Sequence, residues 1–371
     1  MYGGMETMIP QEVRHLDSLG YDVHVVSAKP KNQSRLSDIE GVHEHHYPES
    51  FSRFPWLIKD MLSMIWICVF IRRRLRRTRL LTISFSVTDG AGVALARLLG
   101  GNIRMLLRIV GPLSYEVVHF VPEGKLRYEV YSRLFMLLEA FSYMVADRIL
   151  PVSEFEEANI ESYGISKDKV KLVRCGIDSQ RFGMVQPTKL SGLPEGRDVV
   201  MFVGRFVEKN GPLVIASAVP KVIESHSGSA FVFVGDGVLR PRLETELAEY
   251  VSSGAVLFTG YRRDIPELLA QADVYAGHVS SLVEGLGQTV FEAMMSGLPV
   301  VVGDDAISRK IITDDVNGIL VPKDDPLAVA DSVIALLNDP SKREAIGRMA
   351  RETAVTQLSF ESMMTEMLHQ V

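Results

Sequence analysis

The sequence has little of what marks secreted, metal-binding or membrane-spanning proteins. Its 371 residues include two cysteines, Cys68 and Cys175, which are too few for a disulfide framework or a cysteine-based metal site. We interpret both as buried, small apolar side chains in a reducing compartment. Internal repeats of about 20 to 50 residues are also absent, so the chain is not a repeat protein.

Long hydrophobic runs are missing as well. Met61 to Ile71 has eleven residues with Ser63 as its single polar member, whereas a membrane-spanning helix needs about 20. The chain opens directly on Met-Tyr-Gly-Gly, without the pattern of a signal peptide. We therefore expect a cytoplasmic protein.

Positive charge is scarce in the second half. Residues 186–371 carry 16 Lys and Arg against 25 Asp and Glu, whereas residues 1–185 carry 24 against 21, which argues against a nucleic-acid partner. Six arginines directly follow the apolar run: Arg72, Arg73, Arg74, Arg76, Arg77 and Arg79. They are consistent with peripheral docking on the anionic inner face of the plasma membrane or on a lipid-phosphate acceptor. A solvated basic turn is the alternative.

What is present is a globular composition, 47% apolar and 23% charged, in a chain long enough for two domains. Alternating strand and helix patterns are typical of parallel α/β layers. We predict a first domain over residues 1–185, opening with a helix that Gly20 ends. Its expected strands are Asp22–Ser27, Leu80–Phe85, Met105–Val110, Arg148–Val152 and Val170–Arg174.

A second domain is predicted over residues 186–355. Pro187 to Gly196, with two prolines and two glycines, is typical of a linker. The chain closes with helical segments from about Pro326, and we expect residues 356–371 to return as a helix to the first domain. The expected strands are Val199–Val203, Ala230–Val234, Val256–Thr259, Val274–Ala276, Pro299–Val302 and Gly318–Val321.

The start of the chain is unusual for such a domain. Gly3-Gly4 opens directly onto a helix, although this loop should itself follow a strand, because βαβ units begin with β. Without that strand, a neighbouring strand would have unpaired backbone groups. We therefore expect either a misassigned start or a chain of low stability.

Ser281 to Met294 is the most informative segment. Gly285 and Gly287 let the backbone approach a ligand closely, and the helix start that follows has free N–H groups for a diphosphate. Glu284 precedes the helix and can accept hydrogen bonds from sugar hydroxyls. Glu292 lies about one turn into the helix and can reach a ribose diol. Taken alone, the segment is equally consistent with a glycine turn and two solvated glutamates.

A second segment supplies positive charge. The expected strand Val199–Val203 ends in Gly204-Arg205, and Lys209 follows before the next helix. Two fixed cations beside a helix start can clamp a diphosphate and stabilise it as a leaving group. A surface Arg and Lys without a ligand are the alternative.

Together, the Glu-x7-Glu segment and the upstream Gly-Arg with its Lys resemble the family-4 glycosyltransferases of the GT-B fold. The resemblance runs through most of the chain and includes Gly3-Gly4, Ala146-Asp147, Val152–Glu154, Cys175–Asp178, Gly235–Gly237, Phe258–Gly260, Ala272-Asp273 and Asn317–Val321.

This resemblance implies two Rossmann-like domains whose parallel sheets face each other across a cleft. It implies a retaining, metal-independent enzyme that moves a hexose from a nucleotide-diphosphate sugar to a glycan or lipid-linked acceptor. No cofactor is implied besides that donor substrate. The leaving diphosphate would assist attack on the same face of the sugar.

The resemblance also assigns residues by position. Arg205 and Lys209 would bind the donor diphosphate as catalytic groups. Glu284, also catalytic, would hold the transferred sugar, and Glu292 the ribose. Further donor contacts are implied for Gly4, Tyr261, Arg262, Leu286, Gly287 and Gln288.

Two positions depart from the family pattern. Val110 stands where the family often has a histidine, and His119 and Glu116 are the nearest polar substitutes. The usual Gly-Gly-x-x-Glu is replaced by Ala306–Lys310, so contacts made there are expected to differ. A nucleotide-sugar epimerase of the same fold and a non-catalytic sugar-nucleotide-binding protein remain as alternatives.

Two other signals are weak. Gly235-Asp236-Gly237 lacks the third glycine of a dinucleotide-binding loop. His43, His45 and His46 form a cluster without a partnering cysteine or well-spaced carboxylate, so the sequence does not predict a metal site.

Overall fold

The structure is a computed structural model of the chain. It describes residues 5–27, 42–46, 48, 56–75, 80–85, 87–109, 125–183, 185, 196–282 and 285–371. The chain divides into two compact units, the first made of Met1–Cys175 with Met364–Val371 and the second of Gly176–Met363. The sequence-based boundaries were drawn instead at residues 185/186 and 355/356.

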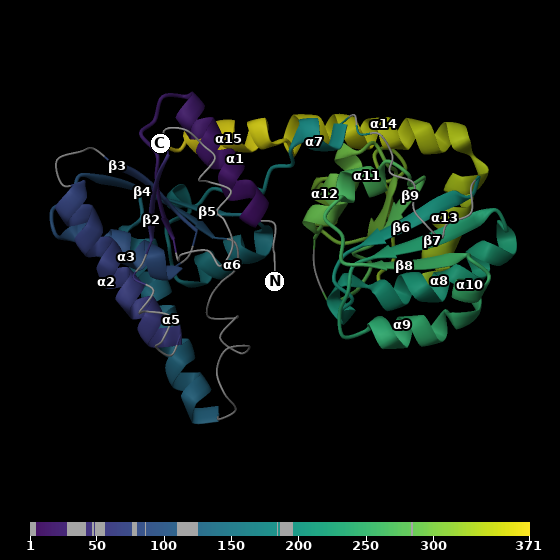
Figure 1. Cartoon of the computed structure of the whole chain (residues 1–371), viewed down its shortest axis with the longest axis horizontal. Coiled ribbons are helices and arrows are strands. Elements are labelled where there is room, and N and C mark those ends of the chain that lie inside the picture. Colours follow the sequence, from purple (N-terminus) through teal and green to yellow (C-terminus); the bar gives the residue numbers. More distant parts are fainter. Residues whose placement is uncertain are drawn as a thin grey trace. The chain divides into compact units, whose positions relative to one another are not determined.

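The first unit alternates helices with parallel strands (Figure 1). Its described strands form a two-stranded sheet, β1-β2, and a three-stranded sheet in the order β3-β4-β5. The strands are β1 (His24–Ser27), β2 (His43–His46), β3 (Leu80–Ser84), β4 (Ile103–Ile109) and β5 (Arg148–Pro151). The longer helices are α1 (Met5–Ser18), α2 (Trp56–Arg74), α3 (Val87–Leu98), α5 (Lys125–Val145) and α6 (Glu154–Ser162).

The core of this unit lies between the β3-β4-β5 sheet and its helices. Met105, Leu107 and Ile109 of β4 are at most 1% exposed, because alternate residues of the strand point toward the helices. Helix α2 packs on α3, and α3 packs on α5. Asp147 joins these layers, since its carboxylate accepts hydrogen bonds from Arg97 of α3 at 2.6 and 2.9 Å and from the Met105 amide at 2.8 Å.

Most strands expected in the first unit are confirmed to within two residues at each end. One expectation was wrong, and one strand was missed. Val170–Arg174 is not a strand among the described residues and contributes one isolated bridge, between Val170 and Ile149. Strand β2 was not predicted at all.

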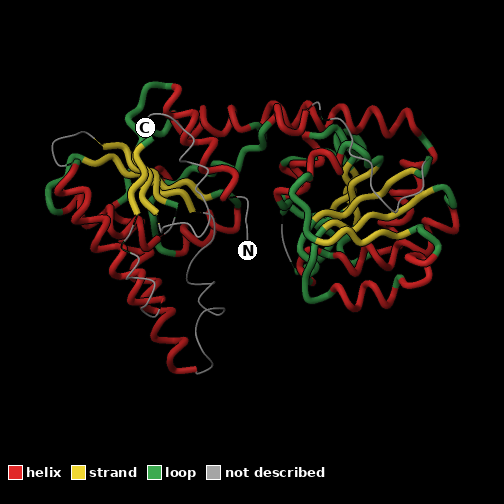
Figure 2. Tube along the Cα trace, viewed as in Figure 1, coloured by secondary structure: helices red, strands yellow, loops and turns green. Residues whose placement is uncertain are grey.

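The second unit contains a six-stranded parallel sheet in the order β11-β10-β9-β6-β7-β8. Helices lie on both of its sides (Figure 2). The strands are β6 (Asp198–Val203), β7 (Ser229–Val234), β8 (Val256–Gly260), β9 (Val274–Ala276), β10 (Val300–Gly303) and β11 (Ile319–Val321). The helices are α7 (Ser179–Gly183), α8 (Pro212–Ser225), α9 (Arg240–Glu246), α10 (Ala248–Ser252), α11 (Ile265–Leu269), α12 (Gln288–Met295), α13 (Pro326–Asn338) and α14 (Pro340–Gln357).

Alternation along the strands produces two separate cores. Val199, Met201 and Val203 face one cluster, which includes residues of α12 and α14. Val200 and Phe202 face the other, which includes residues of α8 and α13. A sheet that is buried on both faces needs nearly continuous apolar strands, as β6 has. The six strands expected for this domain are all confirmed to within one residue at each end.

Helix α15 (Phe360–Leu368) closes the chain. Its last residues belong to the first unit, where Glu366 forms an ion pair with Lys171 at 3.0 Å and the Gln370 carbonyl accepts from Arg104 at 3.1 Å. None of the helices among the described residues combines the length and apolar character needed to cross a membrane.

Several residues singled out in the sequence lie outside the described part of the chain. They are Gly3, Gly4, Arg76, Arg77, Arg79, Val110, Glu116, His119, Glu284 and nearly all of the Pro187–Gly196 segment.

Candidate active site

The candidate site lies at the edge of the second unit's sheet where its parallel strands end. The loops after β6, β7, β9 and β10 all leave this edge, because parallel strands point the same way. The residues expected to bind a donor phosphate follow two of these strands, β6 and β9. Parallel α/β sheets commonly bind ligands at this edge.

The loop after β6 carries the two expected cations. Arg205 and Lys209 are exposed, so both are available to an anionic ligand. The Asn210 side chain donates to the Arg205 carbonyl at 2.9 Å and braces the loop from within. Gly211 then takes a left-handed φ of 75°, where a Cβ would lie 3.0 Å from Val279 of the loop after β9.

Gly235-Asp236-Gly237 packs against this same loop. A Cβ on Gly235 would come within 2.0 Å of the Gly204 carbonyl oxygen, and one on Gly237 within 2.5 Å of the Phe206 carbonyl oxygen. The Phe206 amide donates to the Asp236 carbonyl at 2.9 Å. These glycines therefore allow two backbone segments to touch, which accounts for them without a dinucleotide.

The start of α12 is open to an anion. Gly287 is its N-cap with an extended backbone (φ −81°, ψ 161°), and no side chain of a described residue caps the first turn. Uncapped N–H groups at a helix start can bind phosphate. Thr289 fixes this turn against the sheet, because its hydroxyl is hydrogen-bonded to the buried Tyr275 hydroxyl at 2.9 Å.

Glu292 lies on α12, one turn after its start, and is half-buried. Burial raises the pKa of its carboxyl to about 7, with the charge of Arg181 acting in the opposite direction. Arg181 belongs to α7, and its guanidinium donates to the Arg263 carbonyl at 3.3 Å. Glu292 can therefore change its charge near neutral pH, and a ligand that donates hydrogen bonds would favour the ionised form.

His278 is a residue of this site that sequence reasoning missed. It has a left-handed φ of 53° and packs on Gly287, where a Cβ would come within 2.1 Å of the His278 Nε2. Its Nδ1 is buried and has no hydrogen-bond partner among the described residues. Burial lowers the pKa of the imidazole to about 4, and the charges of Lys209 and Lys323 act in the same direction. The available signal was its position, two residues after β9.

Asp305 is the second residue that the sequence did not indicate. Its carboxylate accepts from the amides of Gly285 at 3.0 Å, Ile307 at 2.8 Å and Ser308 at 2.7 Å, and forms an ion pair with Lys323 at 2.7 Å. Burial acts against the ionised carboxylate, but the Lys323 ammonium and these amides outweigh it and lower the pKa of Asp305 to about 2. Asp305 thus connects Gly285, in the loop before α12, to Ala306–Lys310, the segment that stands in place of the family's Gly-Gly-x-x-Glu.

The other expected donor contacts are distributed around the same unit. Leu286, Gly287 and Gln288 form the entry to α12 and are half-buried. Tyr261 follows β8 and is 59% exposed. Arg262 is held by Asp264, to which its Nε donates at 2.8 Å, so its guanidinium is already partly engaged.

Comparison with known proteins gives two family matches. Residues 188–353 match the family described as "Glycosyl transferases group 1", and residues 2–181 match the one described as "Glycosyltransferase Family 4". The two matches adjoin and span most of the chain.

Individual relatives agree with these matches. UDP-Gal:alpha-D-GlcNAc-diphosphoundecaprenol alpha-1,3-galactosyltransferase of Escherichia coli is 25% identical over 351 residues, which cover 91% of this chain and 86% of that protein. D-inositol 3-phosphate glycosyltransferase of Xylanimonas cellulosilytica is 31% identical, over 56% of this chain and 53% of its own length.

Solved structures resemble the chain over nearly its whole length. A glycosyltransferase from Rickettsia africae ESF-5 has a TM-score of 0.75 at 17% identity and covers 99% of this chain and 94% of its own. Anabaena Alr3699/HepE in complex with UDP has a TM-score of 0.71 at 17% identity, covering 99% and 95%. At this identity the likeness concerns the fold.

Proposed function

Because the chain is a family-4 glycosyltransferase with the GT-B fold, we propose that it transfers a sugar from a nucleotide-diphosphate donor to a glycan or lipid-linked acceptor. One observation carries the donor assignment. Arg205, Lys209 and the uncapped start of α12 all follow strands at the same edge of one sheet. Two cations and a helix start are what a diphosphate requires.

Each part of the donor has a proposed contact. Arg205 and Lys209 bind the diphosphate, and the main chain of Leu286, Gly287 and Gln288 lines the phosphate and sugar site. The half-buried Glu292 accepts hydrogen bonds from the ribose. Four further contacts come from the family pattern: Glu284 to the transferred sugar, Tyr261 and Arg262 to the base, and Gly4 to the diphosphate.

We propose that the reaction retains the anomeric configuration and needs no metal. The bond between the anomeric carbon and the diphosphate oxygen breaks, and the acceptor hydroxyl attacks from the same face. Its proton passes to the leaving diphosphate, whose developing charge Arg205 and Lys209 stabilise. A chelator should therefore leave the transfer rate unchanged, and loss of activity that added Mg²⁺ or Mn²⁺ restores would contradict this.

Uridine nucleotides are the first donors to test. The name of the E. coli relative gives UDP-Gal as its donor, and the Anabaena structure holds UDP. Thermal unfolding of the full chain with a panel of UDP-, GDP- and ADP-sugars should show a rise in Tm for one nucleotide class. A chain that no nucleotide sugar stabilises would contradict the donor assignment.

The acceptor requirement distinguishes transfer from epimerisation. With the stabilising donor, nucleotide diphosphate should be released only when a glycan or lipid-linked acceptor is added. Glu284→Gln should lower this transfer while leaving nucleotide affinity largely unchanged. Conversion of the donor to its epimer without any acceptor would contradict transfer.

The proposed acceptor side includes a peripheral membrane contact. Met61, Ile65 and Val69 of α2 are 44%, 48% and 39% exposed and recur at intervals of one helical turn. The same helix ends in Arg72, Arg73 and Arg74. An apolar stripe that ends in basic residues suits an anionic lipid surface, and we place the enzyme on the inner face of the plasma membrane.

A further inference from the structure

The two-stranded sheet of the first unit gathers histidines on one face. Strands β1 and β2 are parallel and in a register that pairs His24 with His43 and Val26 with His45. Because alternate residues of a strand share a face, His43 and His45 lie on the same side as His24. Glu44 and His46 occupy the other side, where their side chains are 3.5 Å apart.

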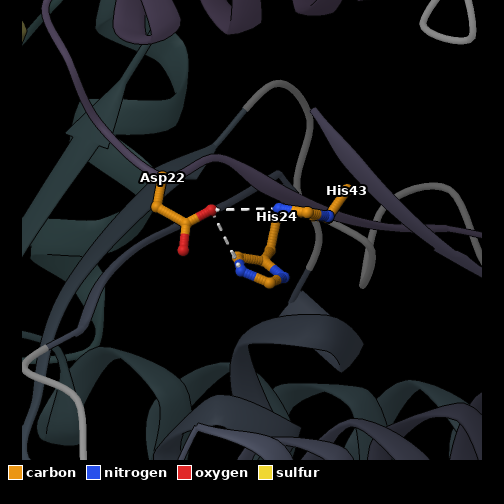
Figure 3. Close-up of side chains that lie close together, drawn as sticks. All are labelled: Asp22, His24 and His43. Atoms are coloured by element: carbon orange, nitrogen blue, oxygen red, sulfur yellow. Dashed lines mark ion pairs between the residues drawn. The ribbon is translucent and has the colours of Figure 1, made fainter. Parts of the chain in front are cut away.

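Asp22 completes this group from the residues before β1 (Figure 3). Its Oδ1 lies 3.4 Å from the Nε2 of His24 and 3.4 Å from the Nε2 of His43. Ligand atoms of the three residues all lie within 4.8 Å of one another. The sequence did not indicate a carboxylate for this cluster, because Asp22 is 21 residues from His43 and only the strand register brings the two together.

The 3.4 Å separations suit ligands of one ion better than direct hydrogen bonds. Hydrogen bonds between nitrogen and oxygen are about 2.7–3.2 Å long. Two ligands of a tetrahedral zinc ion, each bonded at about 2.0–2.1 Å, are separated by roughly 3.4 Å. Asp22 and each histidine are therefore at the spacing of two corners of such a tetrahedron.

His45 orients one of the ligands. Its Nε2 is 2.9 Å from the Nδ1 of His24, and the two rings are stacked at 5.2 Å between centroids. If Nδ1 of His24 donates to His45, the lone pair of its Nε2 faces Asp22, as a metal ligand requires.

An ion can reach the group from solvent. The side chains of Asp22 and His43 are 74% and 57% exposed, whereas that of His24 is 24% exposed. The neighbouring His45 packs on Phe70 of α2, with 4.4 Å between the ring centroids. Three ligands with one open side leave a fourth position for water.

We propose that Asp22, His24 and His43 bind one divalent transition-metal ion of the zinc type, with His45 as a positioning residue. One carboxylate oxygen and two neutral imidazole nitrogens are ligands that zinc prefers. The ion would join β1 to β2 and stabilise the first unit against unfolding. Its ligands all belong to the first unit, whereas the described residues that we propose as donor contacts belong to the second.

Metal binding can be measured directly on the full chain, freed of any affinity tag and of bound metal. Titration with Zn²⁺ by calorimetry, and with Co²⁺ by its visible absorption, should give one ion per chain. Asp22→Asn and His43→Ala should each weaken binding by more than tenfold, and His45→Ala by about tenfold. His369→Ala, which removes an exposed histidine of the same unit, is the matched control and should bind like the unaltered chain.

Thermal unfolding gives a second readout. Zn²⁺ should raise Tm in the unaltered chain and in His369→Ala but not in Asp22→Asn, a nearly isosteric change that keeps the fold. The proposal is overturned if no stoichiometric ion binds at neutral pH. It is equally overturned if Asp22→Asn and His43→Ala bind Zn²⁺ as tightly as His369→Ala, because the histidines would then be only a proton-binding cluster or a nonspecific surface.

Discussion

Lys209 and Lys323 set the electrostatics around His278. Burial lowers the pKa of its imidazole, and the two lysine charges act in the same direction. Asp305 forms an ion pair of 2.7 Å with Lys323. Lys209 is exposed and forms no ion pair with another described residue. At the scale of single residues, Lys323 therefore serves to hold the loops in place, while Arg205 and Lys209 are the exposed cations that we propose for the donor.

Removing either exposed cation should mainly slow the reaction. Arg205→Ala and Lys209→Ala are each expected to raise the activation free energy by about 2–4 kcal/mol and so to lower kcat/KM. The reason is that a stabilising charge is lost where the leaving diphosphate develops its own negative charge. Steady-state kinetics with the stabilising donor measure this. Arg242→Ala on α9, which removes an exposed arginine paired with Glu246, is the control. Unchanged turnover in both site variants would refute the assignment.

The pKa of Glu292 predicts how nucleotide binding depends on pH. The carboxyl titrates at about 7, and ribose hydroxyls donate more strongly to its ionised form. Affinity for the nucleotide diphosphate should therefore rise about tenfold between pH 6 and pH 8. Glu292→Gln should bind more weakly at pH 8 and lack this rise. Calorimetry measures the nucleotide affinity of both proteins at each pH. The difference between the two proteins cancels the titration of the nucleotide's own phosphate. Affinities that change with pH in parallel would disprove the role of Glu292.

How far the residues of the site could be predicted depended on whether they follow a pattern. Arg205, Lys209 and the entry to α12 stand at fixed places after strands, so spacing predicted where they lie, while their contacts with the donor stay a prediction. His278 and Asp305 act through contacts with residues brought near by folding, such as Gly287 and Lys323. No local residue pattern marks such contacts, and the one available signal, the place of His278 two residues after β9, did not distinguish it from other loop residues.

At the scale of elements, strands were predictable where they are buried on both faces. The apolar run Val199–Val203 of β6 predicted a strand buried on both faces. Strand β2 consists of His43-Glu44-His45-His46, which has neither β-branched residues nor an apolar face, and its pairing with β1 overrides its weak strand propensity. Val170–Arg174 shows the converse. Its apolar residues predicted a strand, but among the described residues this segment forms one isolated bridge, between Val170 and Ile149.

Helix α1 is attached to β4 by a buried pair of charges. Glu12 of α1 and Arg108 of β4 are 2% and 0% exposed, with 3.7 Å between the Glu12 Oε1 and the Arg108 Nη1. Burial raises the pKa of Glu12 from 4.5 to about 7, with Arg108 acting in the opposite direction. Between these two values the folded protein holds a proton that the unfolded chain has released, so stability falls as pH rises through that window.

Glu12→Gln should abolish this dependence. Between pH 5 and pH 8 the unaltered chain should lose up to about 3 kcal/mol of unfolding free energy that the variant does not lose. Denaturant unfolding of both proteins at the two pH values measures it. Glu366→Gln, which removes a half-exposed partner of Lys171, should behave like the unaltered chain. If the stability of Glu12→Gln changes with pH as much as that of the unaltered chain, the buried carboxyl is ionised throughout.

At the scale of the whole molecule, membrane binding should be peripheral and sensitive to salt. Liposomes with anionic lipid should carry the chain upward in a flotation gradient, less so as salt rises, because screening weakens attraction between charges. Replacing the six arginines from Arg72 to Arg79 with glutamine should abolish flotation. Replacing Lys167 and Lys169 of the same unit should not. Flotation that survives loss of the arginines would exclude this mode of binding.

The proposed donor contacts are concentrated in the second unit, with Gly4 as the exception, and this has an evolutionary consequence. Every described residue that we assign to the nucleotide sugar lies between Arg205 and Glu292, within a unit that has its own sheet and two cores of its own. Mutations there can change the choice of sugar without touching the core of the other unit. The donor assignment therefore predicts that a lineage of such enzymes can change its choice of sugar by substitution or recombination in one half of the gene.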